Sequence, residues 1–487
     1  MNDLVDRERE VQELRALAGD GRRLALLYGR RRIGKTFLLT RAWEPPARVL
    51  YFTASATAPE VNRRALLQEA GAWSGEELPA EDYPTWRTVF RAVFGLVPEE
   101  PVVVVLDEFQ YLATGDAGLR EVASELNAVW EGKLTRGGGL LVVLAGSAVH
   151  TLAALEAGGS PLFGRLDWRH RLAPFDYLDA GRMVERYGLR DRVLTYAAFG
   201  GTPLYLDAVD DRRSVAENII VLLLAPDGRV RIQVETALEQ EEGLRETARY
   251  RAILATVGLK RRTVGEIAAA LGQPADSPLK RMVKELVRLE YLEEGRNFEA
   301  PGNQAFRYRL ADPAQRFYYG LVLPNESAVA SAGASAVWEE RLAGEAWPAY
   351  VGQQVFEDVV PQAYARRARE ADVPAIGEWG RWEGLDRNRD PVEIDVVARL
   401  LDGPMLTGSA KFRQRAAGPS VFIDHVTALQ RLASSGQGWA REALETKSPF
   451  LFVSAGGFTD SFRELAVEQR DRRVILWTLD ELFRTDV

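Results

Sequence analysis

Eight consecutive residues have the types and spacing of a loop that binds phosphate. The stretch Gly29-Arg30-Arg31-Arg32-Ile33-Gly34-Lys35-Thr36 fits the pattern GxxxxGK[ST], and the apolar run Phe37-Leu38-Leu39 follows it. Its glycines let the backbone curl so that successive N–H groups and a helix N-terminus point at a phosphate. In such a loop Lys35 reaches the β- and γ-phosphates, and the Thr36 hydroxyl ligates Mg²⁺. The spacing therefore predicts a site for ATP and Mg²⁺.

Two carboxylates follow a second apolar run, Val102 to Leu106. Asp107 and Glu108 stand where this strand would end, and open α/β sheets bind ligands at the carboxyl ends of their strands. We expect Asp107 to hold the Mg²⁺ shell and Glu108 to orient or deprotonate the attacking water. This pair favours ATP hydrolysis over binding alone.

Two weaker candidates come later in the chain. Ser147 follows the apolar run Leu140 to Ala145 and is placed to contact the γ-phosphate, but a small residue there is equally a turn former. Arg165, in Pro161-Leu162-Phe163-Gly164-Arg165, is a candidate guanidinium for the transferring phosphate, supplied within one subunit or between two. A surface arginine in an ion pair is its alternative.

The elements that must position these residues alternate as in an α/β fold. Apolar, β-branched runs separated by helical segments predict a parallel sheet with helices on both sides. The expected strands are 24–28, 48–54, 101–106 and 140–145. The division that we expect is an ATPase core at 1–180, a helical domain at 181–245, a winged helix-turn-helix at 246–325 and a C-terminal α/β domain at 337–487.

Finer elements follow within the later domains. The winged helix-turn-helix should comprise helices 250–257, 264–271 and 277–289, a turn at 294–297 and a strand at 306–310. The C-terminal strands should be 393–399, 405–411, 449–454 and 474–478, and the Ala/Gly/Ser-rich stretch 327–336 should be a linker.

Composition excludes several classes of chemistry. The 487 residues include no cysteine and only three scattered histidines, so disulfides, thiolate metal sites and a histidine-based triad are poor hypotheses. The longest apolar stretches are far shorter than a membrane span, and the start of the chain lacks an apolar signal region. We therefore expect a cytoplasmic protein with no membrane partner.

Several motifs together resemble the archaeal-type ATPase family in the STAND branch of P-loop NTPases. They are the Leu4-Val5-Asp6-Arg7-Glu8 box, the loop at 29–36, Leu106 to Gln110, Leu144 to Ser147, Pro161 to Arg165, and Gly200-Gly201-Thr202-Pro203-Leu204-Tyr205-Leu206. The resemblance implies an ATP-driven switch with an extra strand between the loop strand and the Asp107 strand. Residues 48–54 are our candidate for that strand. It also implies a C-terminal domain of the DUF234 kind, with a restriction-endonuclease-like, PD-(D/E)xK nuclease fold.

The nuclease-like resemblance selects four residues. Glu357, Asp395 and Lys411 match the acids and the lysine that such a fold uses with Mg²⁺. Glu393 shares a strand face with Asp395, although its carboxylate would start about 7 Å away. An active member would carry an acid at position 409, where this chain has Ser409. A polar strand face without catalysis is the alternative.

Charge leaves nucleic-acid binding open. The net charge is −8, yet residues 249–310 hold 12 Lys and Arg against 7 Asp and Glu. The basic residues in 260–262 and 280–288 would meet phosphates in a DNA-binding helix-turn-helix, but the same pattern is also typical of an ordinary amphipathic helix. Trp379, Trp382 and a charged loop at 381–389 would suit nucleic acid or protein equally.

Two functional hypotheses remain. The first is an ATPase that acts on DNA through its winged helix and nuclease-like domain. The second is a STAND-type switch that forms homo-oligomers with nucleotide state and binds no nucleic acid. A plain transcriptional regulator would leave Glu108 without a role.

Overall fold

The chain forms two compact units. The computed structural model describes residues 5–19, 21–44, 47–96, 101–132, 139–241, 244, 246–370 and 372–484. The first unit extends to Phe175 and includes Thr202–Leu204, and the second comprises Asp176–Gly201 and the chain from Tyr205 onward. None of the described helices has both the length and the apolar character needed to cross a membrane.

A five-stranded sheet forms the centre of the first unit. All of its neighbouring strands are parallel, and their order is β2-β3-β4-β1-β5. The strands are β1 (Arg22–Tyr28), β2 (Arg48–Thr53), β3 (Val102–Asp107), β4 (Leu140–Gly146) and β5 (Trp168–Arg171). The sequence predicted the first four, whereas the short β5, with its alternating polar residues, was missed.

The order of the strands corrects one expectation. The strand between β1 and β3 is β4, which pairs with both, whereas β2 lies at the edge of the sheet beside β3. The assignment of residues 48–54 to the inserted position was therefore wrong. The physical reason is that chain order does not determine sheet order when helical crossovers let a strand pass its neighbours.

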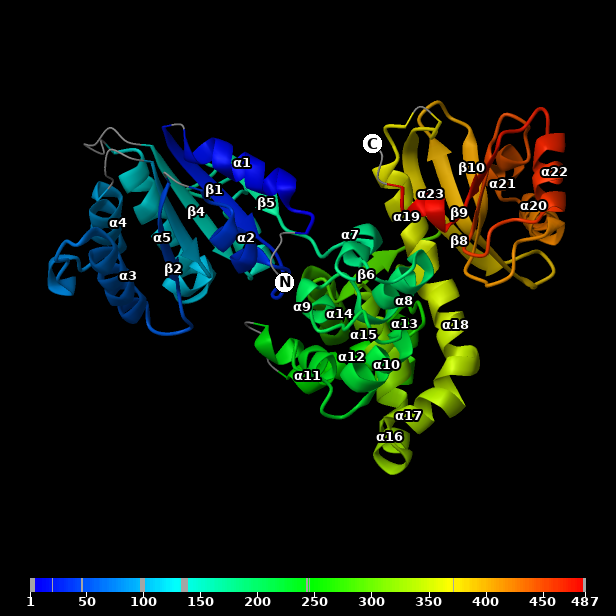
Figure 1. Cartoon of the computed structure of the whole chain (residues 1–487), viewed down its shortest axis with the longest axis horizontal. Helices are drawn as coiled ribbons and strands as arrows, with labels where there is room; N and C mark the ends of the chain where they lie inside the picture. Colours follow the sequence, from blue (N-terminus) through cyan, green and yellow to red (C-terminus); the bar gives the residue numbers. More distant parts are fainter. Residues whose placement is uncertain are drawn as a thin grey trace. The chain divides into compact units, whose positions relative to one another are not determined.

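Helices cover both faces of this sheet (Figure 1). Alternate side chains of the buried strands point to opposite faces, so each face has its own apolar core. One core joins the sheet to α3, α4 and α5, and the other joins it to α1 and α2. The helices are α1 (Glu8–Ala18), α2 (Lys35–Arg41), α3 (Pro59–Ser74), α4 (Trp86–Gly95), α5 (Gly115–Trp130) and α6 (Val149–Ala153).

The second unit begins with helices and contains no linker at 327–336. Apart from Gly333, that stretch lies in the helices α16 and α17, because its alanines favour helix. Gly333 has a φ of +88° and separates the two helices, so the linker expectation was wrong. We call residues 247–310 the basic segment. The α-helices around it are α7 (Tyr177–Arg182), α8 (Leu189–Phe199), α9 (Pro203–Leu206, whose first two residues belong to the first unit), α10 (Val215–Ile219), α11 (Arg229–Glu235), α15 (Pro313–Phe317), α16 (Glu326–Ala332), α17 (Ala334–Val337), α18 (Trp347–Tyr350) and α19 (Glu357–Arg366).

The basic segment folds as three helices followed by a two-stranded antiparallel sheet. Its elements are α12 (Thr247–Val257), α13 (Val264–Ala270), α14 (Ser277–Arg288), β6 (Leu292–Gly295) and β7 (Arg307–Leu310). Capping side chains start two of the helices, because Thr263 accepts from the Glu266 N–H and Asp276 from the Leu279 N–H. The strand β6 was not predicted, since its sequence Leu-Glu-Glu-Gly has little β propensity.

A second five-stranded sheet ends the chain, in the order β12-β11-β10-β9-β8. β9 is antiparallel to both β8 and β10, while β10, β11 and β12 are parallel. The elements are β8 (Ile376–Leu385), β9 (Pro391–Leu400), β10 (Met405–Lys411), α20 (Pro419–Ser434), α21 (Gly438–Ala443), β11 (Phe450–Ser454), α22 (Asp460–Glu468), β12 (Val474–Trp477) and α23 (Leu479–Leu482). The expected loop at 381–389 was wrong in its first half, because residues 381–385 belong to β8, while residues 386–389 lie in the turn before β9.

A buried ion cluster joins the basic segment to the C-terminal part within the second unit. The Asp358 carboxylate in α19 accepts from Arg309 of β7 and from Arg316 of α15, each at 2.7 Å. Burial raises the pKa of Asp358, but the two guanidinium groups outweigh it and hold that pKa well below its ordinary value. Since each buried charge needs its partner, these elements are coupled in folding.

His425 gives the C-terminal sheet a predictable dependence on pH. Its ring is buried against Phe450 and Phe452, with Nε2 at 3.1 Å from the Thr407 hydroxyl. Burial lowers the pKa of His425 to about 3, so the unfolded chain takes up this proton below about pH 6.5 while the folded chain does not.

His425→Gln should therefore reduce acid sensitivity. Between pH 7 and pH 5 the unmodified protein should lose about 2 kcal/mol more unfolding free energy than the variant, since each pH unit below the unfolded pKa contributes about 1.4 kcal/mol. Urea unfolding of the second unit at the two pH values measures this. Equal losses in the two proteins would show that His425 does not titrate as described.

Candidate functional site

The phosphate-type loop joins β1 to α2 in the first unit. Two of its glycines are required by geometry, because a Cβ at Gly29 would lie 2.3 Å from the Leu172 carbonyl oxygen and Gly34 has a φ of +91°. Helix α2 begins at Lys35, so the loop leads directly into a helix N-terminus. Backbone N–H groups are therefore available to an anion at this point.

Lys35 and Thr36 have different environments in this loop. The Lys35 side chain is buried, and its Nζ donates to the carbonyl oxygens of Gly29 at 2.8 Å and Arg30 at 2.9 Å. Thr36 is exposed, and its hydroxyl donates to the Asp107 carboxylate at 2.9 Å. The lysine thus binds oxygen atoms of the loop itself, and an incoming phosphate would compete for it.

Asp107, at the end of β3, accepts hydrogen bonds from two hydroxyl groups. Its side chain is 1% exposed and accepts from the Thr36 hydroxyl and, at 2.6 Å, from the Tyr51 hydroxyl. Burial and the nearby Asp107 charge raise the pKa of Tyr51. A carboxylate and a hydroxyl are ligands that Mg²⁺ prefers, so this donor set fits the predicted ion. Tyr51 was missed because only the sheet pairing of β2 with β3 brings it here.

Glu108 is held in place by the residues around it. Its backbone is left-handed, with a φ of +53°, which is uncommon outside glycine and aims the side chain away from the strand direction. Its carboxylate accepts from the Ser147 hydroxyl at 2.7 Å, the Ser147 N–H at 3.2 Å and the Gln110 side-chain amide. Ser147 is available because β4 lies next to β3. The sequence predicted a role for Glu108 but not that the Gln110 side chain would hold its carboxylate.

Arg165 lies at the opposite edge of the same sheet. It lies three residues before β5, whose first residue pairs in parallel with Ala25 in the middle of β1, so Arg165 lies toward the amino end of β1. It forms an ion pair at 2.8 Å with Glu131, just after α5. The loop at 29–36 follows the other end of β1, and seven residues of strand span about 20 Å. The structure therefore does not bring Arg165 to the loop of its own chain.

The arginines of the loop differ from one another in contacts and backbone conformation. Arg31 donates to the Tyr111 hydroxyl at 2.6 Å, and Arg32 adopts a left-handed φ of +72°. Ile33, between them and Gly34, is buried in the core that joins the sheet to α1 and α2. The loop is thus anchored by one apolar side chain, whereas its three arginines remain half-exposed.

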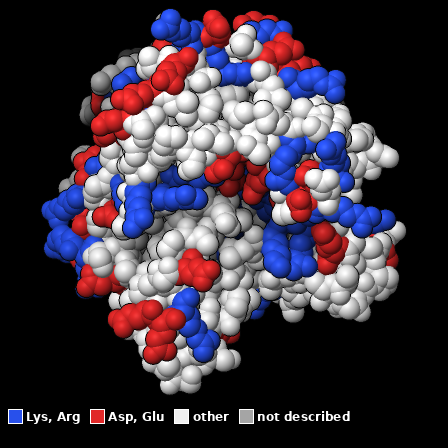
Figure 2. Space-filling model, turned by 90° about the vertical axis from the view of Figure 1, so that its right-hand side faces the viewer, with Lys and Arg blue, Asp and Glu red and all other residues white. Residues whose placement is uncertain are grey.

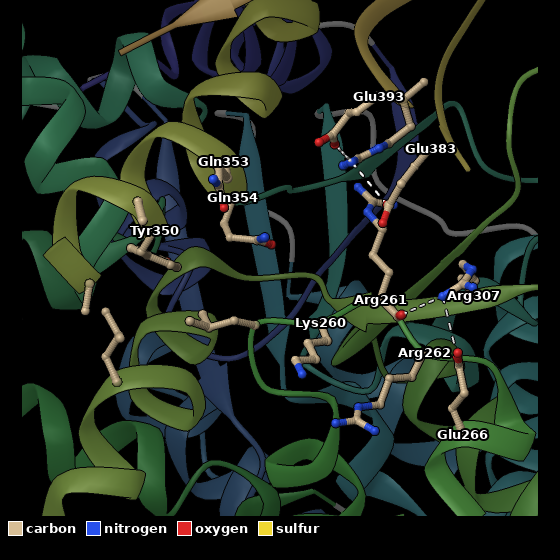
Figure 3. Close-up of a pocket in the computed structure, with 15 residues that line it drawn as sticks. Lys260, Arg261, Arg262, Glu266, Arg307, Tyr350, Gln353, Gln354, Glu383 and Glu393 are labelled. Carbon is tan, nitrogen blue, oxygen red and sulfur yellow. Dashed lines mark hydrogen bonds and ion pairs between the residues drawn. The ribbon is translucent and has the colours of Figure 1, made fainter. Parts of the chain in front are cut away.

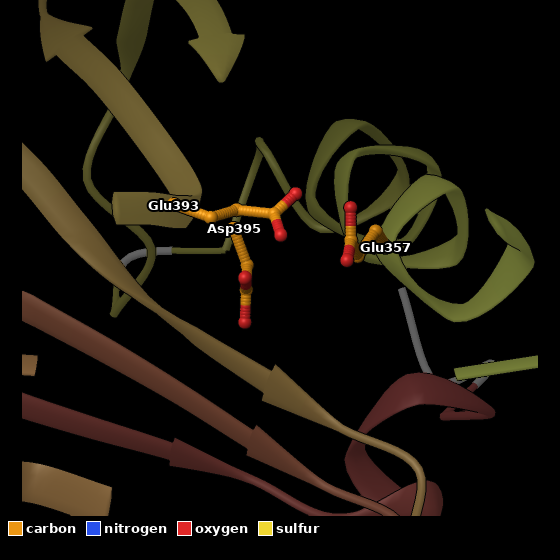
Figure 4. Close-up of side chains that lie close together, drawn as sticks. All are labelled: Glu357, Glu393 and Asp395. Carbon is orange, nitrogen blue, oxygen red and sulfur yellow. The ribbon is translucent and has the colours of Figure 1, made fainter. Parts of the chain in front are cut away.

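A second group of acids lies in the second unit. Carboxylate oxygens of Glu357, Glu393 and Asp395 lie within 4.8 Å of one another (Figure 4). Glu357 is the first residue of α19, while Glu393 and Asp395 share a face of β9. The carboxylates of Glu393 and Asp395 thus lie closer together than strand spacing alone predicted. Burial and the Asp395 charge raise the pKa of Glu357 to about 8, and burial also raises the pKa of Glu393.

Two basic side chains already neutralise these acids. Arg381 contacts Glu357 at 3.3 Å and also pairs with Glu393, and Lys411 donates to Asp395 at 2.9 Å. Ser409, at the position where an acid was expected for metal binding, donates to Asp395 at 2.9 Å. Arg381 was missed as a site residue because its segment was predicted as a loop.

The family match centres on the first unit, whereas the other comparisons cover most of the chain. Residues 4–209 match the model of a family described as an ATPase domain predominantly from Archaea. Over 396 residues the chain is 24% identical to the uncharacterized protein MJECL04 of Methanocaldococcus jannaschii, covering 81% of this chain and 84% of that protein. The family match contains the loop, the end of β3 and Ser147, and it agrees with the resemblance carried by the motifs there.

Three solved structures are also similar to parts of the chain. The Walker-type ATPase of Pyrococcus abyssi aligns with a TM-score of 0.45 and 22% identity, covering 65% of this chain and 96% of that one. The ORC2 protein of Aeropyrum pernix gives 0.43 and 14%, covering 69% and 96%. A STAND protein of Pyrococcus horikoshii gives 0.29 and 14%, covering 66% and 43%.

The carboxylate group in the second unit should depend on Arg381. Arg381→Ala should lower the free energy of unfolding by about 2–4 kcal/mol, because it leaves Glu357 and Glu393 close together without their shared cation. Added Mn²⁺ should restore part of that loss by taking the vacated position. Denaturant unfolding with and without Mn²⁺ measures both effects.

The matched control is Arg387→Ala, at an exposed turn position between β8 and β9. It should change stability by less than about 0.5 kcal/mol and respond to Mn²⁺ as the unmodified protein does. If Arg381→Ala behaved in the same way, Arg381 would have no neutralising role.

Proposed function

We propose that this protein binds Mg·ATP at the loop of residues 29–36 and hydrolyses it. The observation that supports the proposal best is the contact between the Thr36 hydroxyl and the Asp107 carboxylate, at 2.9 Å, beside a helix N-terminus. It joins two motifs 71 residues apart in the chain into one set of ligands for an ion and a phosphate.

The residues of the chain divide the work as follows. Loop N–H groups and Lys35 bind the β- and γ-phosphates, and Thr36 and Asp107 hold Mg²⁺. The bound ion supplies positive charge that stabilises the transferring phosphoryl group. Glu108 orients a water and accepts its proton, while Ser147 and Gln110 keep that carboxylate in one orientation. Gly146 is required for this packing, because a Cβ there would lie 2.2 Å from the Gln110 amide oxygen.

Glu108→Gln should separate binding from turnover. The amide keeps the shape of the side chain but cannot accept the proton, so ATP hydrolysis should fall about 100-fold or more while Mg·ATP affinity changes little. Steady-state phosphate release and equilibrium binding of a fluorescent ATP analogue measure the two quantities. Lys35→Ala serves as the control that should lose binding itself. Turnover that survives Glu108→Gln would remove Glu108 from its role.

We further propose that residues 246–325 form a winged helix-turn-helix whose helix α14 contacts DNA. Lys280 and Arg281 of this helix are exposed, whereas Lys284 and Arg288 pair with Glu294 and Glu285. On the one face that Figure 2 draws, Lys and Arg side chains form separate groups with acidic ones between them, so this face carries no broad basic surface.

We also propose that the C-terminal domain has a nuclease-like fold without cleavage activity. The order of Glu357, Asp395 and Lys411 agrees with that fold, but Ser409 replaces an acid and Arg381 neutralises the carboxylates. The domain would then serve as a binding or structural part of the ATPase.

The competing hypothesis is a switch that assembles with nucleotide state and binds no DNA. The position of Arg165 supports it, because an exposed guanidinium far from its own loop can reach only the nucleotide of another copy. In that arrangement the homo-oligomer would complete the site, as an arginine supplied between subunits does.

DNA stimulation of ATP hydrolysis distinguishes these hypotheses. Double-stranded DNA should raise the rate several-fold at low salt, and the double change Lys280→Ala with Arg281→Ala should remove most of that increase without altering the basal rate. A matched double variant at the exposed Arg212 and Arg229 should keep it. The switch would be favoured if DNA left the specific rate of ATP hydrolysis unchanged while a higher protein concentration raised it. That increase should disappear in a variant that lacks Arg165.

A further inference from the structure

A cavity of about 690 Å³ lies within the second unit (Figure 3). One part of its wall is the turn between α12 and α13, which carries Lys260, Arg261 and Arg262. Arg307 of β7 and Arg381 of β8 add two further positive charges to the lining. The cavity is thus formed jointly by the basic segment and the C-terminal sheet.

The acids in this lining already have partners. Glu266 pairs with Arg307 at 3.5 Å, and Arg381 pairs with Glu383 and Glu393. By contrast, the side chains of Lys260, Arg261 and Arg262 make no hydrogen bond or ion pair with the described part of the chain. The lining thus holds five basic and three acidic side chains, and the acids pair with Arg307 and Arg381 rather than with the basic turn.

Arg261 has the least favourable position of the three. Its side chain is directed toward the acids that hold Arg381, as Figure 3 shows, and it is largely removed from solvent. Burial and the charges of Arg309 and Arg381 lower the pKa of Arg261 to about 9. A bound anion would relieve this repulsion and fill the guanidinium's hydrogen bonds, and phosphate matches the planar geometry of arginine.

The opposite wall offers groups of another kind. Gln353 and Gln354 present side-chain amides, which make no hydrogen bond with the described residues, and Figure 3 shows them across from the basic turn. Leu259, Leu321 and Ala349 add apolar surface. Amides can pair with the edge of a base, and apolar surface can pack against its ring.

From these features we infer that the cavity binds a small phosphate-bearing ligand of nucleotide size, with its phosphate at Arg261 and its base near Gln353 and Gln354. The volume is in the range of small-molecule sites, whereas a nucleic-acid duplex does not fit within it. This second site lies outside the first unit and does not rest on the proposed ATPase activity.

AMP binding to the full-length Lys35→Ala protein tests the inference without the loop site. Calorimetry should detect one AMP per chain, and adenosine, which lacks the phosphate, should bind at least tenfold more weakly. Arg261→Ala should weaken AMP binding about tenfold or more, because a charge-assisted hydrogen bond is lost. The exposed Lys260→Ala should weaken it less and is expected to fold normally.

Arg229→Ala, an exposed arginine on α11 outside the cavity lining, is the matched control and should bind AMP unchanged. The inference would be overturned if the protein did not bind AMP. It would also be overturned if the Lys260→Ala, Arg261→Ala and Arg229→Ala variants all bound AMP with the same affinity. A short DNA strand that binds through Arg261 while AMP does not would overturn it as well, since that would make the turn a nucleic-acid contact. Thermal melting of each variant identifies any that fail to fold.

Discussion

The first unit depends on one constraint, which is that parallel strands bring their carboxyl ends to a common edge of the sheet. Because β4 lies between β1 and β3, the residues that follow these three strands become neighbours. The loop after β1, Asp107 and Glu108 at the end of β3, and Ser147 after β4 therefore converge without any long side chain having to reach across. A different strand order would keep every motif and still separate Glu108 from Ser147.

Negative charge is stabilised in different ways at Asp107 in the first unit and at Glu357 and Glu393 in the second. Asp107 is held by two hydroxyl groups, which can rearrange around a cation. Glu357 and Glu393 are held instead by Arg381, a fixed cation that belongs to the protein. The first arrangement accommodates an ion that comes and goes, whereas the second stabilises the fold at the cost of an open coordination site.

The sequence predicted the parts of the fold that are local and strongly patterned. The loop at 29–36 and the buried strand before Asp107 have spacings that tolerate few other structures, and they were located within one or two residues. Which strand stands between β1 and β3 depends on the packing of whole helices, and no local pattern records it. The same limit explains Tyr51 and Gln110, whose site contacts arise only from sheet pairing and a left-handed turn.

The candidate residues of the second unit show a further limit. Period-two alternation placed Glu393 and Asp395 on one face, and the structure brings both to Glu357. Arg381 escaped prediction because β8 has a register irregularity between Gly380 and Trp382, which interrupts its alternation. Arg165 was recognised from a motif, but only the direction of β5 shows which edge of the sheet it occupies.

The contacts of Asp358 limit which parts of this chain could be lost in evolution. Its carboxylate lies on α19, while the two guanidinium groups that it accepts from lie on β7 and α15. A descendant that lost the C-terminal sheet together with α19 would lose this carboxylate. Arg309 would keep Glu293 of β6, but the buried Arg316 would have no carboxylate partner and only backbone carbonyl oxygens left, which would destabilise this part of the fold. The basic segment and the C-terminal sheet are therefore expected to be inherited together, as one evolutionary module.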